Sequence, residues 1–256
     1  MKLNKCNKVF NLILPIATIL VLILVWLVGS VIVKEAIVLP TPKDTFVRMF
    51  KLLVEGEFWQ NLMGTLLRSL IAFFVSFLVG LALAICVKFS KISRPIISII
   101  VSLLRAMPTI AVILLLLLWT NSKVASVVVT MLVVLPTVFS SMQDALGKID
   151  GDIIAMLKLY NVGKKEIFFK YILPIILPST IRTIGSGLAL NIKLIVASEV
   201  IAGTARSIGN MMTEAKIYFE TAELFAIVIF MLIISVTIEL VFAKIAEKVG
   251  GKYESK

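Results

Sequence analysis

The sequence contains no histidine, and its only two cysteines are Cys6 and Cys86. Histidine nitrogen and cysteine sulfur are the main soft ligands of transition metals, so a metal site built from them is excluded. Cys6 lies in a basic N-terminus and Cys86 in an apolar run, a spacing that matches neither a disulfide framework nor a zinc motif. The sequence therefore predicts no metal and no cofactor.

Charged residues are also scarce, at 16% of the chain, while hydrophobic residues reach 60% and the mean hydropathy is +1.07. Soluble domains contain about 45–50% apolar residues, so the composition indicates an integral membrane protein surrounded by lipid. The formal net charge of +11 could suggest a nucleic-acid partner. The cations lie between apolar runs, however, as in the loops of membrane proteins, and no nucleic-acid partner is predicted.

Long apolar runs predict six membrane-spanning helices in an all-α protein with one transmembrane domain, residues 1–256. The first run, Val9 to Val33, exceeds the roughly 7–15 residues of a signal-peptide core and is expected to remain as a span. About 20 residues cross a bilayer as a helix. The spans are predicted at about 10–33, 62–87, 95–119, 124–143, 183–204 and 223–243.

The distribution of Lys and Arg predicts the orientation of these spans in the cell membrane (plasma or inner membrane). With the N-terminus inside, sixteen of the 26 cations lie in cytoplasmic segments, seven in outer segments and three within spans. Cytoplasmic loops collect Lys and Arg, so both termini are expected in the cytoplasm. The outer segment 34–61 has apolar residues at helical spacing after Pro40 and Pro42, and predicts either a surface helix or a packed brace between the first two spans.

The connection at about 146–182 is not a simple loop. Its piece "IIAMLKLY", residues 153–160, is too short to cross a membrane and too apolar to lie bare in water. Asp152 can cap this helix and Asn161 can end it, because Asn tolerates the left-handed conformation. Either the piece docks on a cytoplasmic partner or it packs beneath the protein's own bundle.

The second piece of the connection, "KKEIFFKYIL", predicts another amphipathic helix. Its apolar face is expected to contain Ile167, Phe168, Tyr171 and Ile172. Pro174 and Pro178 are then expected to break the chain before the fifth span.

Ionisable and polar residues inside spans are candidates for function, because they are costly in lipid. Glu199 is expected in the path or a subunit interface, in an ion pair with Arg105 or another helix, or at the membrane surface. Asn191 and Ser198 share a face with each other and could line a polar path. Arg105, Met107 and Pro108 predict either a plain proline kink or a helix break that opens backbone groups to a cavity.

Several stretches resemble one family, the inner-membrane permeases of ATP-binding-cassette (ABC) importers, and specifically the nitrate, sulfonate and taurine type. The family motif reads Glu-Ala-Ala, three residues, Gly, nine residues, Ile, one residue, Leu-Pro. Anchored on Leu173 and Pro174, it places Tyr171 at the Ile position and Asn161 at the Gly position, with Ala155, Met156 and Leu157 at Glu-Ala-Ala. "VLPTPKDTFVRM", "LLRAMPTIAVILLLLLW" and "LIVASEVIAGTARSIGNMMTEAK" are similar to other family segments, in the expected order.

The resemblance implies a type I ABC importer permease fold and a path at the interface of two subunits, expected to be identical. A separate ATPase subunit would receive the cytoplasmic coupling loop. An extracytoplasmic substrate-binding protein would deliver a small solute. This solute would resemble nitrate, a sulfonate or taurine, or would be a vitamin precursor. The coupling residues implied are Ala155, Met156, Leu157, Tyr160, Asn161, Gly163, Tyr171, Leu173 and Pro174.

Two alternatives remain at the level of sequence. An ion-gradient-driven secondary transporter should show two related halves, and no internal repeat is visible. A membrane enzyme would need converging catalytic groups, and none with such spacing is visible. The chain has no G-x-x-x-x-G-K-[ST] phosphate loop, so it is predicted not to be an enzyme, with ATP hydrolysed on the separate ATPase.

Overall fold

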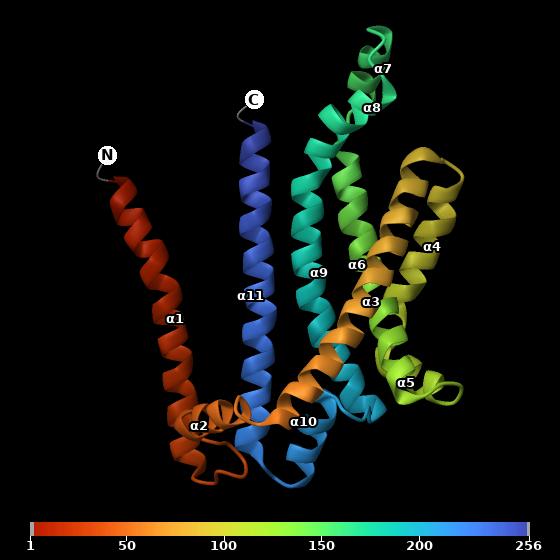
Figure 1. Cartoon of the computed structure of the whole chain (residues 1–256). Helices are drawn as coiled ribbons and strands as arrows, with labels where there is room; N and C mark the ends of the chain where they lie inside the picture. The colour runs from red at the N-terminus through yellow and green to blue at the C-terminus, as the bar shows by residue number, and fades with distance from the viewer. Residues whose placement is uncertain (1–2, 255–256) are drawn as a thin grey trace. The chain divides into compact units, whose positions relative to one another are not determined.

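In a computed structural model, the backbone is described for residues 3–254 and the side chains for Leu14 and residues 17–251. Within these residues the chain is helical, without strands (Figure 1). It divides into two compact units: a first unit of residues 1–59 with 211–230, and a second unit of residues 60–210 with 231–256. The elements are α1 Leu3–Val33, α2 Pro42–Leu52, α3 Gly56–Phe89, α4 Ser93–Ala106, α5 Thr109–Leu117, α6 Ser122–Gly147, α7 Gly151–Leu159, α8 Lys164–Glu166, the π-helix η1 Ile167–Ile172, α9 Leu173–Ala202, α10 Ile208–Ile217 and α11 Thr221–Glu254.

Four helical segments are long and apolar enough to cross a membrane, and they contain the predicted second, fourth, fifth and sixth spans. They are Gly56–Phe89, Ser122–Gly147, Lys164–Ala202 and Thr221–Gly251. A fifth span is possible as the bent pair α4–α5. The backbone of the predicted first span is helical and belongs to α1. The apolar part of α1 with described side chains is Ala17–Val33. The side chains of residues 10–13, 15 and 16 lie outside the described residues.

The predicted third span, 95–119, does not form one continuous helix. α4 and α5 meet at a bend of 93°. Met107 and Pro108 are both extended, with ψ values of 127° and 109°. The proline ring disfavours a helical conformation at the residue before it, which explains why the helix ends here. The structure therefore shows the helix break rather than a plain kink.

The predicted chain break at Pro174 and Pro178 is wrong. The helical segment runs from Lys164 through both prolines to Ala202. Pro174 lies just after the π-helix and Pro178 lies inside α9, and a membrane helix accommodates proline where local π-type adjustments or neighbouring helices satisfy the freed carbonyl groups. The π-helix η1 joins directly to α9, so the second piece of the 146–182 connection continues into the predicted fifth span without an interruption.

In the first unit, α2 is a capped helix held by side-chain contacts. The Asp44 N–H donates to Thr41 Oγ1 at 3.2 Å, and Pro42 occupies the first turn. Arg48 forms ion pairs with Glu55 and with Glu223 at the start of α11. These contacts agree with the packed brace expected for segment 34–61 rather than a helix lying free on a surface.

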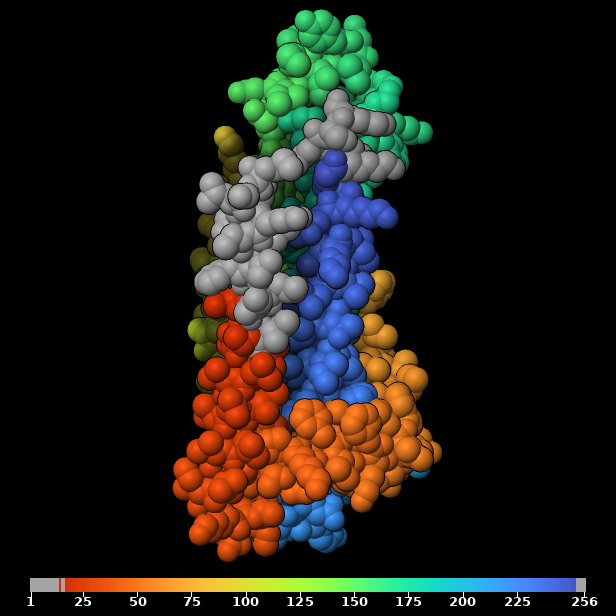
Figure 2. Space-filling model, turned by 90° about the vertical axis from the view of Figure 1, so that its left-hand side faces the viewer, coloured from red at the N-terminus to blue at the C-terminus, as the bar shows by residue number. Residues whose placement is uncertain are grey.

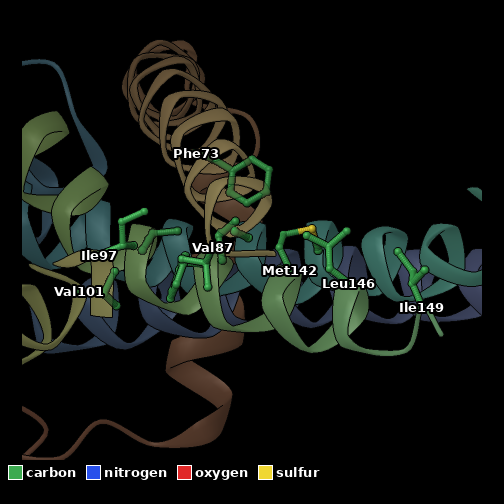
Figure 3. Packing of buried hydrophobic residues seen from close by; sticks show 11 residues of the cluster. Phe73, Val87, Ile97, Val101, Met142, Leu146 and Ile149 are labelled. Atoms are coloured by element: carbon green, nitrogen blue, oxygen red, sulfur yellow. The ribbon is translucent and has the colours of Figure 1, made fainter. Parts of the chain in front are cut away.

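In the second unit, α6 and α9 pack side by side against α3 and α4 around an apolar cluster (Figure 3). The buried members are Phe73, Ala84, Val87, Ile97, Val101, Val134, Val138, Phe139, Met142, Leu146 and Ile149. At Gly185, α9 approaches α11 so closely that an added Cβ would lie 2.4 Å from Phe242 Cβ. Glycine therefore permits this contact between helices.

A buried ion pair joins α3 to the C-terminal end of α9. Glu199 is 0% exposed, and its Oε1 lies 2.7 Å from Arg68 Nη2 and accepts a bond from Arg68 Nε at 2.8 Å. Its Oε2 accepts from Thr65 Oγ1 at 2.8 Å, and Thr65 Oγ1 accepts from the Ile208 N–H at 2.9 Å. One carboxylate thus holds together α3, α9 and the turn before α10.

We expect Arg68→Met to lower the free energy of unfolding by about 3–5 kcal/mol, because it leaves the Glu199 carboxylate buried without its cation. The measurement is the melting temperature of the detergent-solubilised protein. Lys193→Met is the matched control, since it removes a cation that is exposed and forms no ion pair among the described residues. The double variant Arg68→Met, Glu199→Met should lose less stability than the two single losses combined. Equal melting temperatures for Arg68→Met and Lys193→Met would contradict the role of the pair.

Candidate coupling loop and translocation path

α7 is a short helix with a defined start and end. Its N-cap is Asp150, whose Oδ1 accepts the Asp152 N–H at 2.8 Å, so the predicted cap at Asp152 is wrong by two residues. At the other end the Val162 N–H donates to the Leu157 carbonyl at 3.1 Å and the Asn161 N–H to the Lys158 carbonyl at 3.0 Å. Asn161 has φ 57°, which confirms the left-handed helix end expected there.

The apolar side chains of α7 are largely exposed. Leu159 is 83% exposed, Tyr160 77% and Met156 49%, and α7 contains no buried residue. In Figure 1 this helix extends beyond the ends of α6 and α9, and in Figure 2 the same green segment extends past the blue residues of α11 that belong to the same unit. α7 is therefore not packed beneath the bundle, which was the alternative to docking.

The inner side of α7 faces the second piece of the loop. Leu157 is half-buried and lines a pocket of about 420 Å³ together with Ile153, Val162, Ile167 and Tyr171. Val162 and Leu157 are the two residues whose contact usually accompanies this type of helix end. Ala155 and Gly163 are exposed, and Gly163 precedes α8 as its N-cap.

The second piece differs from the predicted amphipathic face. Of the predicted face, Ile167 is buried, and Tyr171 and Ile172 pack against the apolar cluster, but Phe168 does not belong to this face. Phe168 is exposed and contacts the exposed Phe169 edge to face. The reason is the π-helix, whose wider turn changes which residues share a face. Leu173 and Pro174 are half-buried at the start of α9.

The candidates for the translocation path fall into two separate sets. Arg105, Met107 and Pro108 are exposed at the bend between α4 and α5, and Arg105 donates to Ser140 Oγ and to the Pro136 carbonyl. Asn191, Ser198 and Glu199 are buried inside the second unit.

The buried set makes contacts with neighbouring helices. Asn191 Nδ2 donates to the carbonyl and the hydroxyl of Ser69 at 2.7 and 2.6 Å. Ser198 Oγ lies 3.3 Å from Thr130 Oγ1. Glu199 pairs with Arg68 and not with Arg105. Within one chain, these three side chains therefore connect helices to each other.

Sequence reasoning missed Arg68 as the partner of Glu199. Both residues lie near the outer ends of their predicted spans, so their opposite charges come to a similar depth. Complementary charges at equal depth in two spans are the signal that could have indicated this pair.

Comparison with known proteins connects this architecture to a family. The family described as "Binding-protein-dependent transport system inner membrane component" matches residues 76–250. The chain is 25% identical over 234 residues to the taurine transport system permease protein TauC of Escherichia coli, which covers 89% of this chain and 85% of that protein. It is 26% identical over 213 residues to the putative aliphatic sulfonates transport permease protein SsuC of Bacillus subtilis, covering 82% of this chain and 77% of that protein.

Among solved structures, the fold is similar to a chain of the MetNI methionine ABC transporter in inward-facing conformations. The TM-score is 0.63 at 18% sequence identity, with 78% of this chain and 97% of that chain covered. This likeness shows the fold. The match over residues 76–250 shows that the chain belongs to the family of binding-protein-dependent transport system inner membrane components, the permeases of ABC transporters.

Proposed function

We propose that this chain is the membrane-spanning permease subunit of an ABC importer, which forms the path for a small solute and couples to a separate ATPase. The observation that carries the proposal is the exposed apolar surface of α7 at the end of the second unit. Exposed apolar patches usually mark interaction sites, and the family of the chain supplies the kind of partner. ATP is hydrolysed on the partner, because the chain has no phosphate-binding loop.

The continuity of the helix supports a mechanical role for this loop. Leu157 of α7 and Ile167 of η1 line the same pocket, and η1 continues into α9. A closing movement of the ATPase would displace α7 as a small body. α9 would carry this displacement into the membrane, since rigid helices transmit rigid-body movement.

The assembly we propose contains two copies of the chain, two ATPase subunits and an extracytoplasmic substrate-binding protein. Both termini and the coupling loop would be cytoplasmic, as the distribution of Lys and Arg indicates. The solute would be sulfonate-, taurine- or nitrate-like, as the names of the relatives suggest, or a vitamin precursor.

The experiment that tests this function is purification of the chain from its natural membrane in mild detergent. We expect a P-loop ATPase to copurify and to hydrolyse ATP in the complex. Solute uptake that follows an ion gradient, without any bound ATPase, would instead identify a secondary transporter.

Placing a carboxylate on the exposed apolar face of α7 should remove the ATPase. We expect Leu159→Asp and Met156→Asp to reduce copurified ATPase at least about tenfold, because docking would bury an unpaired charge. Val54→Asp is the matched control, since Val54 is 88% exposed and apolar but lies outside the loop. Normal ATPase recovery with both α7 variants would show that this face is not the docking surface.

The left-handed conformation at Asn161 predicts a second, graded effect. Asn161→Gly should keep full coupling, because glycine adopts positive φ without strain. Asn161→Val should cost about 1–2 kcal/mol in the loop and lower transport-coupled ATP hydrolysis. The measurement is solute-stimulated ATPase activity of the purified complex at equal expression. Equal activity of the Gly and Val variants would contradict the requirement for this conformation.

A further inference from the structure

One face of α9 exposes polar residues between Arg182 and Lys193, interrupted by the buried Ala189, and exposes the apolar Ala197 and Ile201 toward the end of the helix. Arg182, Ser186 and Lys193 are exposed, while the other faces of the helix are buried against α3, α6 and α11. Arg182 and Lys193 are separated by three turns, about 16 Å along the axis, and differ by only about 20° around it. Ser186 lies between them on the same side. We call these three residues the α9 polar stripe.

The exposed face of α3 at the same depth is entirely apolar. Ser69 of α3 bonds to Asn191, which places this part of α3 level with Lys193. The exposed side chains nearby on α3 are Leu67, Leu70, Ile71 and Phe74. A helix face against lipid has this composition, so α3 has a lipid-facing surface and the α9 polar stripe does not resemble one.

The predicted depth of Lys193 argues against a simple lipid contact. It lies at the middle of the predicted span 183–204, where an ammonium group that faces hydrocarbon is unfavourable. Among the described residues no ion pair involves Lys193. The nearest carboxylate on α9, Glu199, lies about 120° away around the helix and is already paired with Arg68. An unpaired cation at this depth requires water or a solute.

The inner end of the stripe opens into a polar pocket of about 620 Å³ between α6, α9 and α11. Lys148 and Arg182 line it together with Asp144 and Glu247, so cations and carboxylates balance there. Glu239 of α11 is exposed, and its backbone carbonyl lies beside Gly185 of α9. Gly185 precedes Lys193 by eight residues, toward the inner end of the stripe. The uncompensated charge of this surface is therefore concentrated at Lys193.

We propose that the α9 polar stripe lines the water-filled translocation path, with Lys193 as the residue that favours solutes carrying an anionic group such as a sulfonate or carboxylate. This inference rests on the proposed importer function, in which a second copy supplies the opposite wall. Two copies would place two Lys193 ammonium groups around the path. A neutral vitamin precursor would gain nothing from them, so the stripe favours the anionic solutes.

The test is cysteine accessibility in membrane vesicles from cells whose natural chain is replaced by variants in a Cys6→Ser, Cys86→Ser background. The probes are anionic 2-sulfonatoethyl methanethiosulfonate and its cationic trimethylammonium analogue, without nucleotide and with ATP and vanadate. We expect both probes to modify Lys193→Cys and Ser186→Cys. Ile71→Cys, which is 57% exposed at a similar depth on α3, is the control that should stay unmodified.

The charge preference is measured at Ser186→Cys. It is the rate of modification by the anionic probe divided by the rate of modification by the cationic probe, and it is compared with the same ratio for free cysteine. We expect this ratio to fall about threefold or more with Lys193→Gln at low salt and to persist with Lys193→Arg. An unchanged ratio with Lys193→Gln would overturn the electrostatic role. Unreactive Lys193→Cys in both nucleotide states, or reactive Ile71→Cys, would overturn the lining.

The same vesicles separate this inference from the proposed function. Solubilised after labelling, they show whether the ATPase is bound. An unreactive stripe with the ATPase present would refute only the lining of the path, and a reactive stripe with no ATPase would refute only the importer function.

Discussion

The ion pair between Glu199 and Arg68 fixes the rotation of α9, and the arrangement of the second unit depends on that rotation. A carboxylate that is 0% exposed must meet its cation, so the side of α9 that carries Glu199 has to face α3. Asn191 then meets Ser69, and Ser198 meets Thr130 of α6. The face that remains is the α9 polar stripe, which is exposed as a consequence. A structural pair thus determines which polar residues of α9 are free to meet a solute.

The same helix connects this network to the predicted coupling loop. The helical segment from Lys164 to Ala202 passes through two prolines without interruption, and its inner end includes the π-helix η1. Wide turns of this kind occur often at functional sites. Ile167 and Tyr171 of η1 line a pocket together with Leu157 of α7, and under the proposed function movement of α7 would act on the base of α9 through this region. A break at Pro174, as the sequence suggested, would instead have separated the loop from the span.

Local chemistry made part of this structure predictable from sequence. Long apolar runs predicted six spans, of which four correspond to described helices long and apolar enough to cross a membrane. The tolerance of Asn for positive φ predicted the end of α7 at Asn161. The prolines were harder, because the same residue type ends α4 at Pro108 and is accommodated at Pro174 and Pro178. The difference lies in position within a helix and in the neighbours that satisfy the freed carbonyl groups. The partner of Glu199 is 131 residues away along the chain, and only the folded structure shows which cation reaches it.

Two surfaces of the second unit have a polarity opposite to that of their surroundings. α7 exposes Met156, Leu159 and Tyr160 where the orientation predicts water, and α9 exposes Lys193 where it predicts hydrocarbon. Each would be unfavourable for an isolated chain, since apolar surface is driven out of water and unpaired charge out of lipid. In the proposed assembly, a cytoplasmic partner would relieve the first, and a water-filled path between two copies would relieve the second. The turn at Asn161 joins α7 to the helical segment Lys164–Ala202, so the two surfaces lie on adjacent elements of one connection, and under the proposed function a partner that moves the first would also move the second.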